Sequence, residues 1–131
     1  YFVLDLETAQ LKYVNAGHCY PFMLNAATGE VEEFILPSTP LGFQHKGRFK
    51  VKTVTFTPGS FLLMYSDGLP EALNASQNQF GYEHLKTILK KSSASNSSAA
   101  IFDAIKFAYR KHTRNTLPSD DVTMVILHCN R

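Results

Sequence analysis

Residues 61–68 read Phe-Leu-Leu-Met-Tyr-Ser-Asp-Gly, an apolar run that ends on a carboxylate and a glycine. A short apolar run bounded by turn residues is typical of a buried strand. Asp-Gly is a common turn signal, so this dipeptide by itself is explained by a turn. The run nevertheless predicts that Asp67 lies at the end of a strand.

A second acidic segment, Asp120-Asp121, precedes the apolar run at residues 122–127. Adjacent carboxylates repel each other unless a cation or hydrogen-bond donors offset their charge. A solvated loop with a capping role explains this segment equally well. If the two runs are antiparallel neighbours, however, Asp67 and Asp120 lie at the same edge of a sheet.

Two carboxylates at one edge favour a divalent metal site. Carboxylate oxygens are hard ligands that suit Mg²⁺ or Mn²⁺, which are often held by one or two carboxylates and several waters. Such a metal lowers the pKa of bound water and offsets charge on a phosphoryl group, so no protein nucleophile is needed. We therefore predict that Asp67 and Asp120 are catalytic metal ligands at a site that cleaves a phosphoester.

The first half of the chain consists of short strand patterns separated by turn signals. The predicted strands are Phe2–Glu7, Leu11–Asn15, Phe22–Asn25, Val31–Leu36, Phe49–Phe56 and Phe61–Ser66. We expect hairpins at residues 27–30 and at Pro58-Gly59, because proline presets φ and glycine accepts positive φ. The apolar alternation changes phase near Lys52 and Thr53, which predicts a β-bulge.

After Gly68 the apolar residues follow the i, i+3, i+4 spacing of amphipathic helices. This spacing predicts one helix around residues 85–89 and another over residues 101–112, with N-capping serines in residues 92–98. The continuous apolar run 122–127 predicts an interior strand that is covered on both faces. Strands, then helices, then a strand indicate an α+β fold, an antiparallel β-sandwich flanked by helices.

Composition excludes several classes of protein. The 131 residues are 44% hydrophobic with 10 Phe and 6 Tyr, enough for one domain with a real core. The net charge is +2 and the 13 Lys and Arg residues are spread along the sequence, so we expect no nucleic-acid partner.

The expected location is cytoplasmic. No apolar run approaches the roughly 20 residues that span a bilayer, so we expect no membrane insertion in this segment. Cys19 and Cys129 fit neither a disulfide framework nor a Cys-x-x-Cys pattern, and we expect reduced thiols. The chain opens on a strand-like segment without an initiator Met, and we expect that it comes from a longer protein.

Five motifs follow one another along the chain: Asn15-Ala16-Gly17-His18, Pro40-Leu41-Gly42, residues 58–72 with Tyr65-Ser66-Asp67-Gly68, Phe80-Gly81, and Asp120-Asp121-Val122-Thr123. In this order they resemble the C-terminal half of the SpoIIE-like branch of the metal-dependent PPM serine/threonine phosphatases. The resemblance implies α-β-β-α layers with a binuclear Mn²⁺ or Mg²⁺ centre at one edge. It also implies that residues 1–131 are the C-terminal part of a single phosphatase domain, incomplete at its N-terminus.

The resemblance assigns roles to the acidic motifs. The Asp of Tyr-x-Asp-Gly and the first Asp of Asp-Asp-x-Thr are metal ligands in that family, which here are Asp67 and Asp120. Gly68 joins them as a predicted metal-site residue, and Asp121 is assigned a supporting or substrate-side role. The family's upstream motif, an Asp followed by Gly-His-Gly, does not occur in these 131 residues, so we expect the metal site to be incomplete here.

Asn15, Gly17 and His18 are assigned by the resemblance to a loop at the edge of the active site, where they contact the substrate or support the site residues. A turn in which Gly supplies positive φ and Asn caps explains the same residues equally well. Two departures from the family pattern, Pro70 in place of Thr and residues 76–79 in place of Gly-Glu, leave the predicted ligands unchanged.

The resemblance implies a phosphoserine or phosphothreonine protein phosphatase in bacterial signalling. The expected substrate is a phosphorylated regulatory protein, an anti-sigma-factor antagonist, and the expected regulator is an upstream sensor or receiver domain in the same parent chain. The alternative is a pseudophosphatase or scaffold that binds without turnover. The 131 residues alone are expected to be weakly active or inactive, and uncovered sheet edges predict self-association.

Overall fold

The computed structural model describes residues 1–43, 48–95 and 97–130. The described strands and helices are β1 Phe2–Asp5, β2 Gln10–Tyr13, β3 Phe22–Asn25, β4 Glu30–Glu33, β5 Lys52–Thr55, β6 Phe61–Tyr65, α1 Tyr82–Lys91, α2 Ser98–His112 and β7 Met124–His128. The strands form two antiparallel sheets, with the orders β1-β2-β5 and β4-β3-β6-β7. The predicted α+β class and antiparallel sandwich are confirmed.

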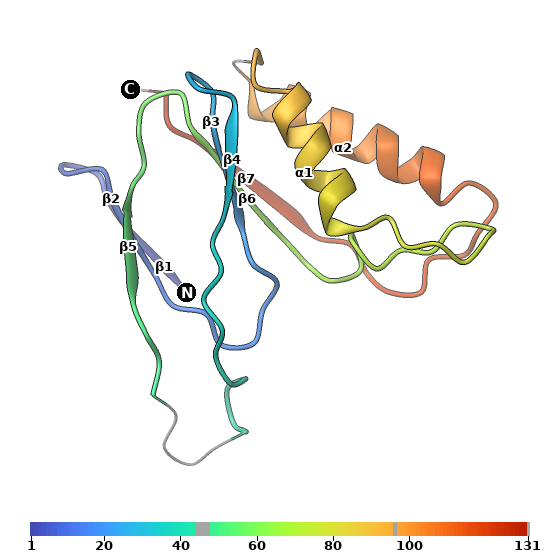
Figure 1. Cartoon of the computed structure of the whole chain (residues 1–131), viewed down its shortest axis with the longest axis horizontal. Helices are drawn as coiled ribbons and strands as arrows, with labels where there is room; N and C mark the ends of the chain where they lie inside the picture. The colour runs from blue at the N-terminus through green and yellow to red at the C-terminus, as the bar shows by residue number, and fades with distance from the viewer. Residues whose placement is uncertain (44–47, 96, 131) are drawn as a thin grey trace.

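The molecule has three layers in its described part. Figure 1 shows the three-stranded sheet on one side of the four-stranded sheet and both helices on the other side. Helix α1 contacts β3 and β4, and α2 contacts β7. A second helical layer, the fourth layer of the predicted α-β-β-α order, does not occur among the described residues.

Strand β6 lies at the centre of this arrangement and is buried on both faces. Phe61, Leu63 and Tyr65 face the helices and belong to the core that contains Leu85 and Ile101. Its other two residues, Leu62 and Met64, face the three-stranded sheet. This two-sided burial explains why residues 61–65 are continuously apolar.

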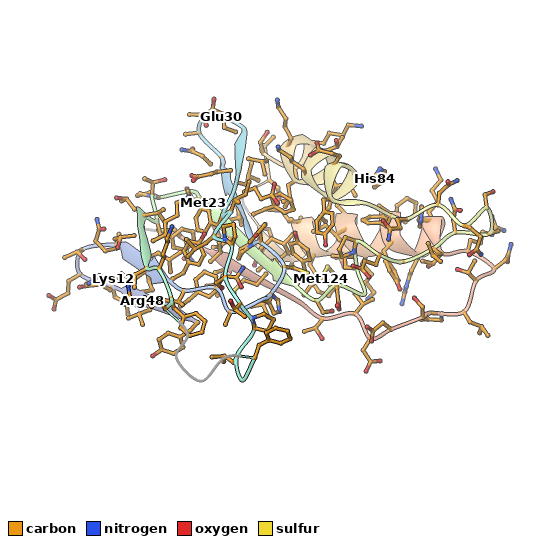
Figure 2. The ribbon with its side chains drawn as sticks, turned by 60° about the horizontal axis from the view of Figure 1, so that its bottom comes forward. Lys12, Met23, Glu30, Arg48, His84 and Met124 are labelled. Atoms are coloured by element: carbon orange, nitrogen blue, oxygen red, sulfur yellow. The ribbon has the colours of Figure 1, made fainter. Side chains whose placement is uncertain are left out.

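The four-stranded sheet contributes side chains to two cores, one between the two sheets and one between this sheet and the helices. Met23 packs in the core between the sheets, and Met124 packs in the core under the helices; both are labelled in Figure 2. Ser97 is the N-cap of α2, and its hydroxyl accepts the Ala100 N–H as the predicted serine cap. No helix among the described residues has the length and apolar character needed to cross a membrane.

The prediction of an interior strand at residues 122–127 is wrong for the described part of the chain. Strand β7 lies at the edge of its sheet and pairs there with β6. Met124 and Ile126 pack on the helix side, whereas Val125 and Leu127 are 45% and 37% exposed. Their side of β7 is open because the core between the sheets reaches β6 but includes no residue of β7.

The predicted β-bulge and one predicted hairpin are also wrong, and the other predicted hairpin is confirmed. Residues 49–51 precede β5, and β5 pairs with β2 in an unbroken register, so the predicted β-bulge is absent. The change in the apolar alternation near Lys52 coincides with the start of the strand. Pro58-Gly59 closes no hairpin, because β5 and β6 belong to different sheets and this turn carries the chain between them. The hairpin at residues 27–30 is present between β3 and β4.

We predict that Leu62→Ala destabilises the chain much more than Leu127→Ala. These leucines are cross-strand partners on the same face, but Leu62 is fully buried and Leu127 is 37% exposed. Burial differences of this kind give a loss of about 2–5 kcal/mol for Leu62→Ala and less than about 1 kcal/mol for Leu127→Ala. Urea denaturation of the 131-residue chain measures both. Equal losses would contradict the open face of β7.

Candidate metal and substrate site

The ends of β6 and β7 meet at one edge of the four-stranded sheet. Tyr65 pairs with Met124 at the end of the ladder. Ser66 continues the contact beyond it, because its N–H donates to the Thr123 carbonyl (3.0 Å) and its hydroxyl accepts the Thr123 N–H (2.9 Å). The same hydroxyl donates to the Asp121 carbonyl (3.0 Å). The antiparallel pairing on which the site prediction depended is therefore present.

Gly68 brings the two acidic segments into close contact. A Cβ at this position would lie 3.1 Å from the carbonyl carbon of Asp121 and 3.4 Å from that of Asp120, and it would overlap the Asp121 carbonyl oxygen. The φ of Gly68 is not positive, so its backbone conformation does not require glycine. Glycine is required here by the close approach of two backbones.

The two carboxylates are exposed and are oriented by neighbouring amides. The Gly68 N–H donates to Oδ1 of Asp67 (3.0 Å), and the Asp121 N–H donates to Oδ1 of Asp120 (2.7 Å). Within the described ranges, Oδ2 of neither side chain accepts a hydrogen bond. One free oxygen on each of two exposed carboxylates fits a hard cation that retains waters. The described residues include no group of three or more His, Cys, Asp or Glu arranged for a metal.

A cavity of about 480 Å³ opens beside Asp67. Its walls come from the β2–β3 connection, the end of β4, the turn after β6 and the start of α1. The lining residues are Gly17, His18, Cys19, Tyr20, Glu33, Asp67, Glu71 and Tyr82. The structure thus brings Gly17 and His18 to Asp67, whereas Asp120 and Asp121 do not line this cavity.

Asn15 does not line the cavity, but its side chain binds the backbone of His18, which does. It is 6% exposed, and its side chain accepts the His18 N–H (2.8 Å) and donates to the His18 carbonyl (2.9 Å). Gly17 has a φ of 83° and packs on Pro40, where a Cβ would lie 2.6 Å from the Pro40 Cγ. The capped turn is therefore present, and it forms part of the cavity next to Asp67.

Several cavity residues were not among the sequence predictions. Glu71 is four residues after Asp67 in the same turn, and its N–H donates to the Asp67 carbonyl (3.0 Å), a local spacing that could have indicated it. Cys19 directly follows the predicted Asn15–His18 motif, whereas Tyr82 reaches the cavity from the start of α1, where no local signal marks it. Burial raises the pKa of the Cys19 thiol, and burial raises the pKa of Tyr82 to about 12, so both groups are protonated at neutral pH.

The family model for stage II sporulation protein E (SpoIIE) matches residues 1–130. The chain belongs to the SpoIIE family. It is 29% identical over 130 residues to protein IcfG of Synechocystis sp., an alignment that covers 98% of this chain and 20% of IcfG. The resemblance inferred from the five motifs is confirmed.

Solved structures confirm the fold. The SiaA-PP2C domain of Pseudomonas aeruginosa matches with a TM-score of 0.81 at 18% identity, over 95% of this chain and 48% of that one. The phosphatase domain of Bacillus subtilis SpoIIE (Mn presoaked) matches with a TM-score of 0.70 at 21% identity, over 99% and 55%. The chain thus spans one fifth of IcfG and about half of these two structures.

We predict that Gly68→Ala weakens both folding and metal binding. The added methyl group would push residues 120–121 away from β6, at a cost of about 1–3 kcal/mol. Displacement of the segment that carries the predicted ligand Asp120 should lower Mn²⁺ affinity about 10- to 100-fold in the complete protein. Urea denaturation and calorimetric Mn²⁺ titration measure the two effects.

The matched control is Gly29→Ala in the β3–β4 turn. Gly29 has a φ of 70°, and an added Cβ would meet only ordinary contacts with Ser93. This substitution should strain the turn and leave Mn²⁺ affinity unchanged. Equal Mn²⁺ affinity in wild type and Gly68→Ala would show that the contact of Gly68 with residues 120–121 does not shape a metal site.

Proposed function

We propose that this chain provides Asp67 and Asp120 as metal ligands of a Mn²⁺- or Mg²⁺-dependent phosphoserine/phosphothreonine protein phosphatase in bacterial signalling. The observation that carries the proposal is the β6–β7 pairing, which leads both carboxylates to one edge of the sheet, with a cavity beside Asp67. Membership of the SpoIIE family supports the reaction class. The manganese-presoaked structure of the B. subtilis SpoIIE phosphatase domain supports the choice of metal.

In this proposal the chain's own residues orient the ligands. Asp67 and Asp120, with Gly68 beside them, would hold the metal. A bound divalent cation supplies activation of water and charge neutralisation at a phosphoryl group. The amides of Gly68 and Asp121 hold the two carboxylates in place, and the Ser66 hydroxyl joins the two segments. Asp121 thereby supports the site through its backbone.

The further metal ligands and the regulation lie outside these residues in our proposal. Residues 1–131 would form the C-terminal part of the phosphatase domain, and an upstream Asp with a Gly-His-Gly motif would complete the binuclear centre. The substrate would be a phosphorylated regulatory protein, an anti-sigma-factor antagonist, with a sensor or receiver domain in the same chain. The width of the cavity, whose lining comes from four segments, supports a substrate larger than free phosphate.

We predict that Asp67→Asn abolishes Mn²⁺-dependent hydrolysis of p-nitrophenyl phosphate by the complete protein. Loss of one carboxylate ligand removes several kcal/mol of charge stabilisation, so the rate should fall at least about a hundredfold. The same substitution at Asp103, an exposed acid on α2, is the matched control and should leave the rate unchanged.

Two other outcomes would change the proposal. Unchanged hydrolysis by Asp67→Asn would remove Asp67 from the mechanism. Mn²⁺ binding without any turnover by the wild-type complete protein would instead favour a pseudophosphatase or scaffold that binds a phosphoprotein.

A further inference from the structure

Residues 14–21 connect β2 to β3, and residues 17–20 of this connection form one wall of the cavity beside Asp67. The Asn15 side chain binds both backbone polar groups of His18, at 2.8 and 2.9 Å, and is almost fully buried while doing so. A buried amide that satisfies an N–H and a carbonyl of one residue fixes the turn between them. The direction in which His18 and Cys19 leave the turn therefore depends on Asn15.

Contacts from other segments hold the same turn against the rest of the site. The Ser38 hydroxyl donates to the Asn15 carbonyl, and Gly17 packs on Pro40. The Tyr65 hydroxyl donates to the Tyr20 carbonyl at 2.8 Å. Because Tyr65 is the last residue of β6, two residues before Asp67, the wall has a fixed position relative to the strand that carries Asp67.

Charge indicates which part of a phosphoester this cavity accepts. Glu33 and Glu71 line it together with Asp67, and carboxylates repel a phosphate dianion. Asp120, the other proposed ligand, does not line the cavity. At the β6–β7 edge the cation that we propose on Asp67 and Asp120 would offset the charge of the phosphate, whereas Glu33 and Glu71 have no such cation. The phosphate group would therefore bind at this edge, and the cavity is left for the group attached to the phosphate.

Polar groups on the wall can contact such a substrate. The Tyr82 hydroxyl lines the cavity beside the Cys19 side chain, with which it forms a hydrogen bond. The His18 ring is exposed, and its Nδ1 lies 3.2 Å from the Cys19 carbonyl oxygen. Its Nε2 has no hydrogen-bond partner within residues 1–43, 48–95 and 97–130, so it is free to contact a ligand.

We propose that residues 17–20 contact the leaving-group side of the phosphoester, and that Asn15 is the positioning residue that holds this wall beside Asp67. The inference rests on the proposed phosphatase function. Asn15 acts through the backbone of His18 and does not touch the substrate. It should therefore affect binding of the leaving group and leave the phosphate and the metal unaffected.

The test compares Asn15→Ala with Asn25→Ala in the complete protein with Mn²⁺. Asn25 is a matched control, because its Oδ1 accepts the N–H groups of Ala27 (3.0 Å) and Thr28 (3.3 Å) in a similar capped turn at the other end of β3. The KM for p-nitrophenyl phosphate reports phosphate and leaving group together. The inhibition constant of inorganic phosphate reports the phosphate alone.

We expect Asn15→Ala to raise the KM about tenfold, since two hydrogen bonds that hold the wall are lost. Both kcat and the inhibition constant of phosphate should stay within about twofold of wild type. Asn25→Ala should change none of the three. Asn15→Asp, which retains the acceptor for the His18 N–H, should recover part of the lost affinity.

A second measurement reports the rigidity of the cavity wall and does not depend on enzymatic activity. Amide hydrogen exchange of residues 16–19 should accelerate in Asn15→Ala and stay unchanged in Asn25→Ala. Unchanged exchange or an unchanged KM in an active Asn15→Ala protein would overturn this inference alone, as would a parallel rise of KM and the phosphate inhibition constant. Absence of hydrolysis by the wild-type protein would overturn the proposed function and this inference together.

Discussion

Burial of β6 on both faces is the constraint on which the rest of the structure depends. Leu63 packs under the helices while its neighbour Leu62 packs against the other sheet, and both are about 1% exposed or less. Burial of each such side chain contributes about 1.5–3 kcal/mol. A slip of one residue would exchange the two faces, so the register of β6 against β3 and β7 is strongly specified. That register determines where Asp67 leaves the sheet.

The candidate site follows from this register through short backbone contacts. Ser66 and Gly68 flank Asp67, and both contact residues 120–123 at the start of the neighbouring strand. The end of β6 is also tied to the cavity wall, because Tyr65 binds the Tyr20 carbonyl. Neither acidic segment depends on a long flexible side chain for its position. The two carboxylates are placed by the backbone, which suits a site that must hold a fixed geometry.

The sequence predicted those parts of the molecule for which local pattern is sufficient. The strand at Phe61–Tyr65, the α+β class and the antiparallel meeting of Asp67 and Asp120 all follow from periodicity and from strand ends. The edge position of β7 could not be predicted, because an apolar run such as 124–127 does not reveal which residues cover it. Pro58-Gly59 likewise predicts that the chain turns, but these two residues do not determine which strand the next segment pairs with. Cys19 and Tyr82 meet only through tertiary packing, and the metal-ligand roles stay predictions.

The order of the strands along the chain has a consequence for folding. The Asp67 side of the site is synthesised more than fifty residues before β7, with two helices between them. Closing this long loop costs entropy before the β6–β7 ladder returns any stability. The sandwich and the β3–β6 pairing can form while the acidic edge is still open. The candidate site therefore assembles late, and an interrupted or truncated chain would have a partly formed sandwich without the second acidic segment at its edge.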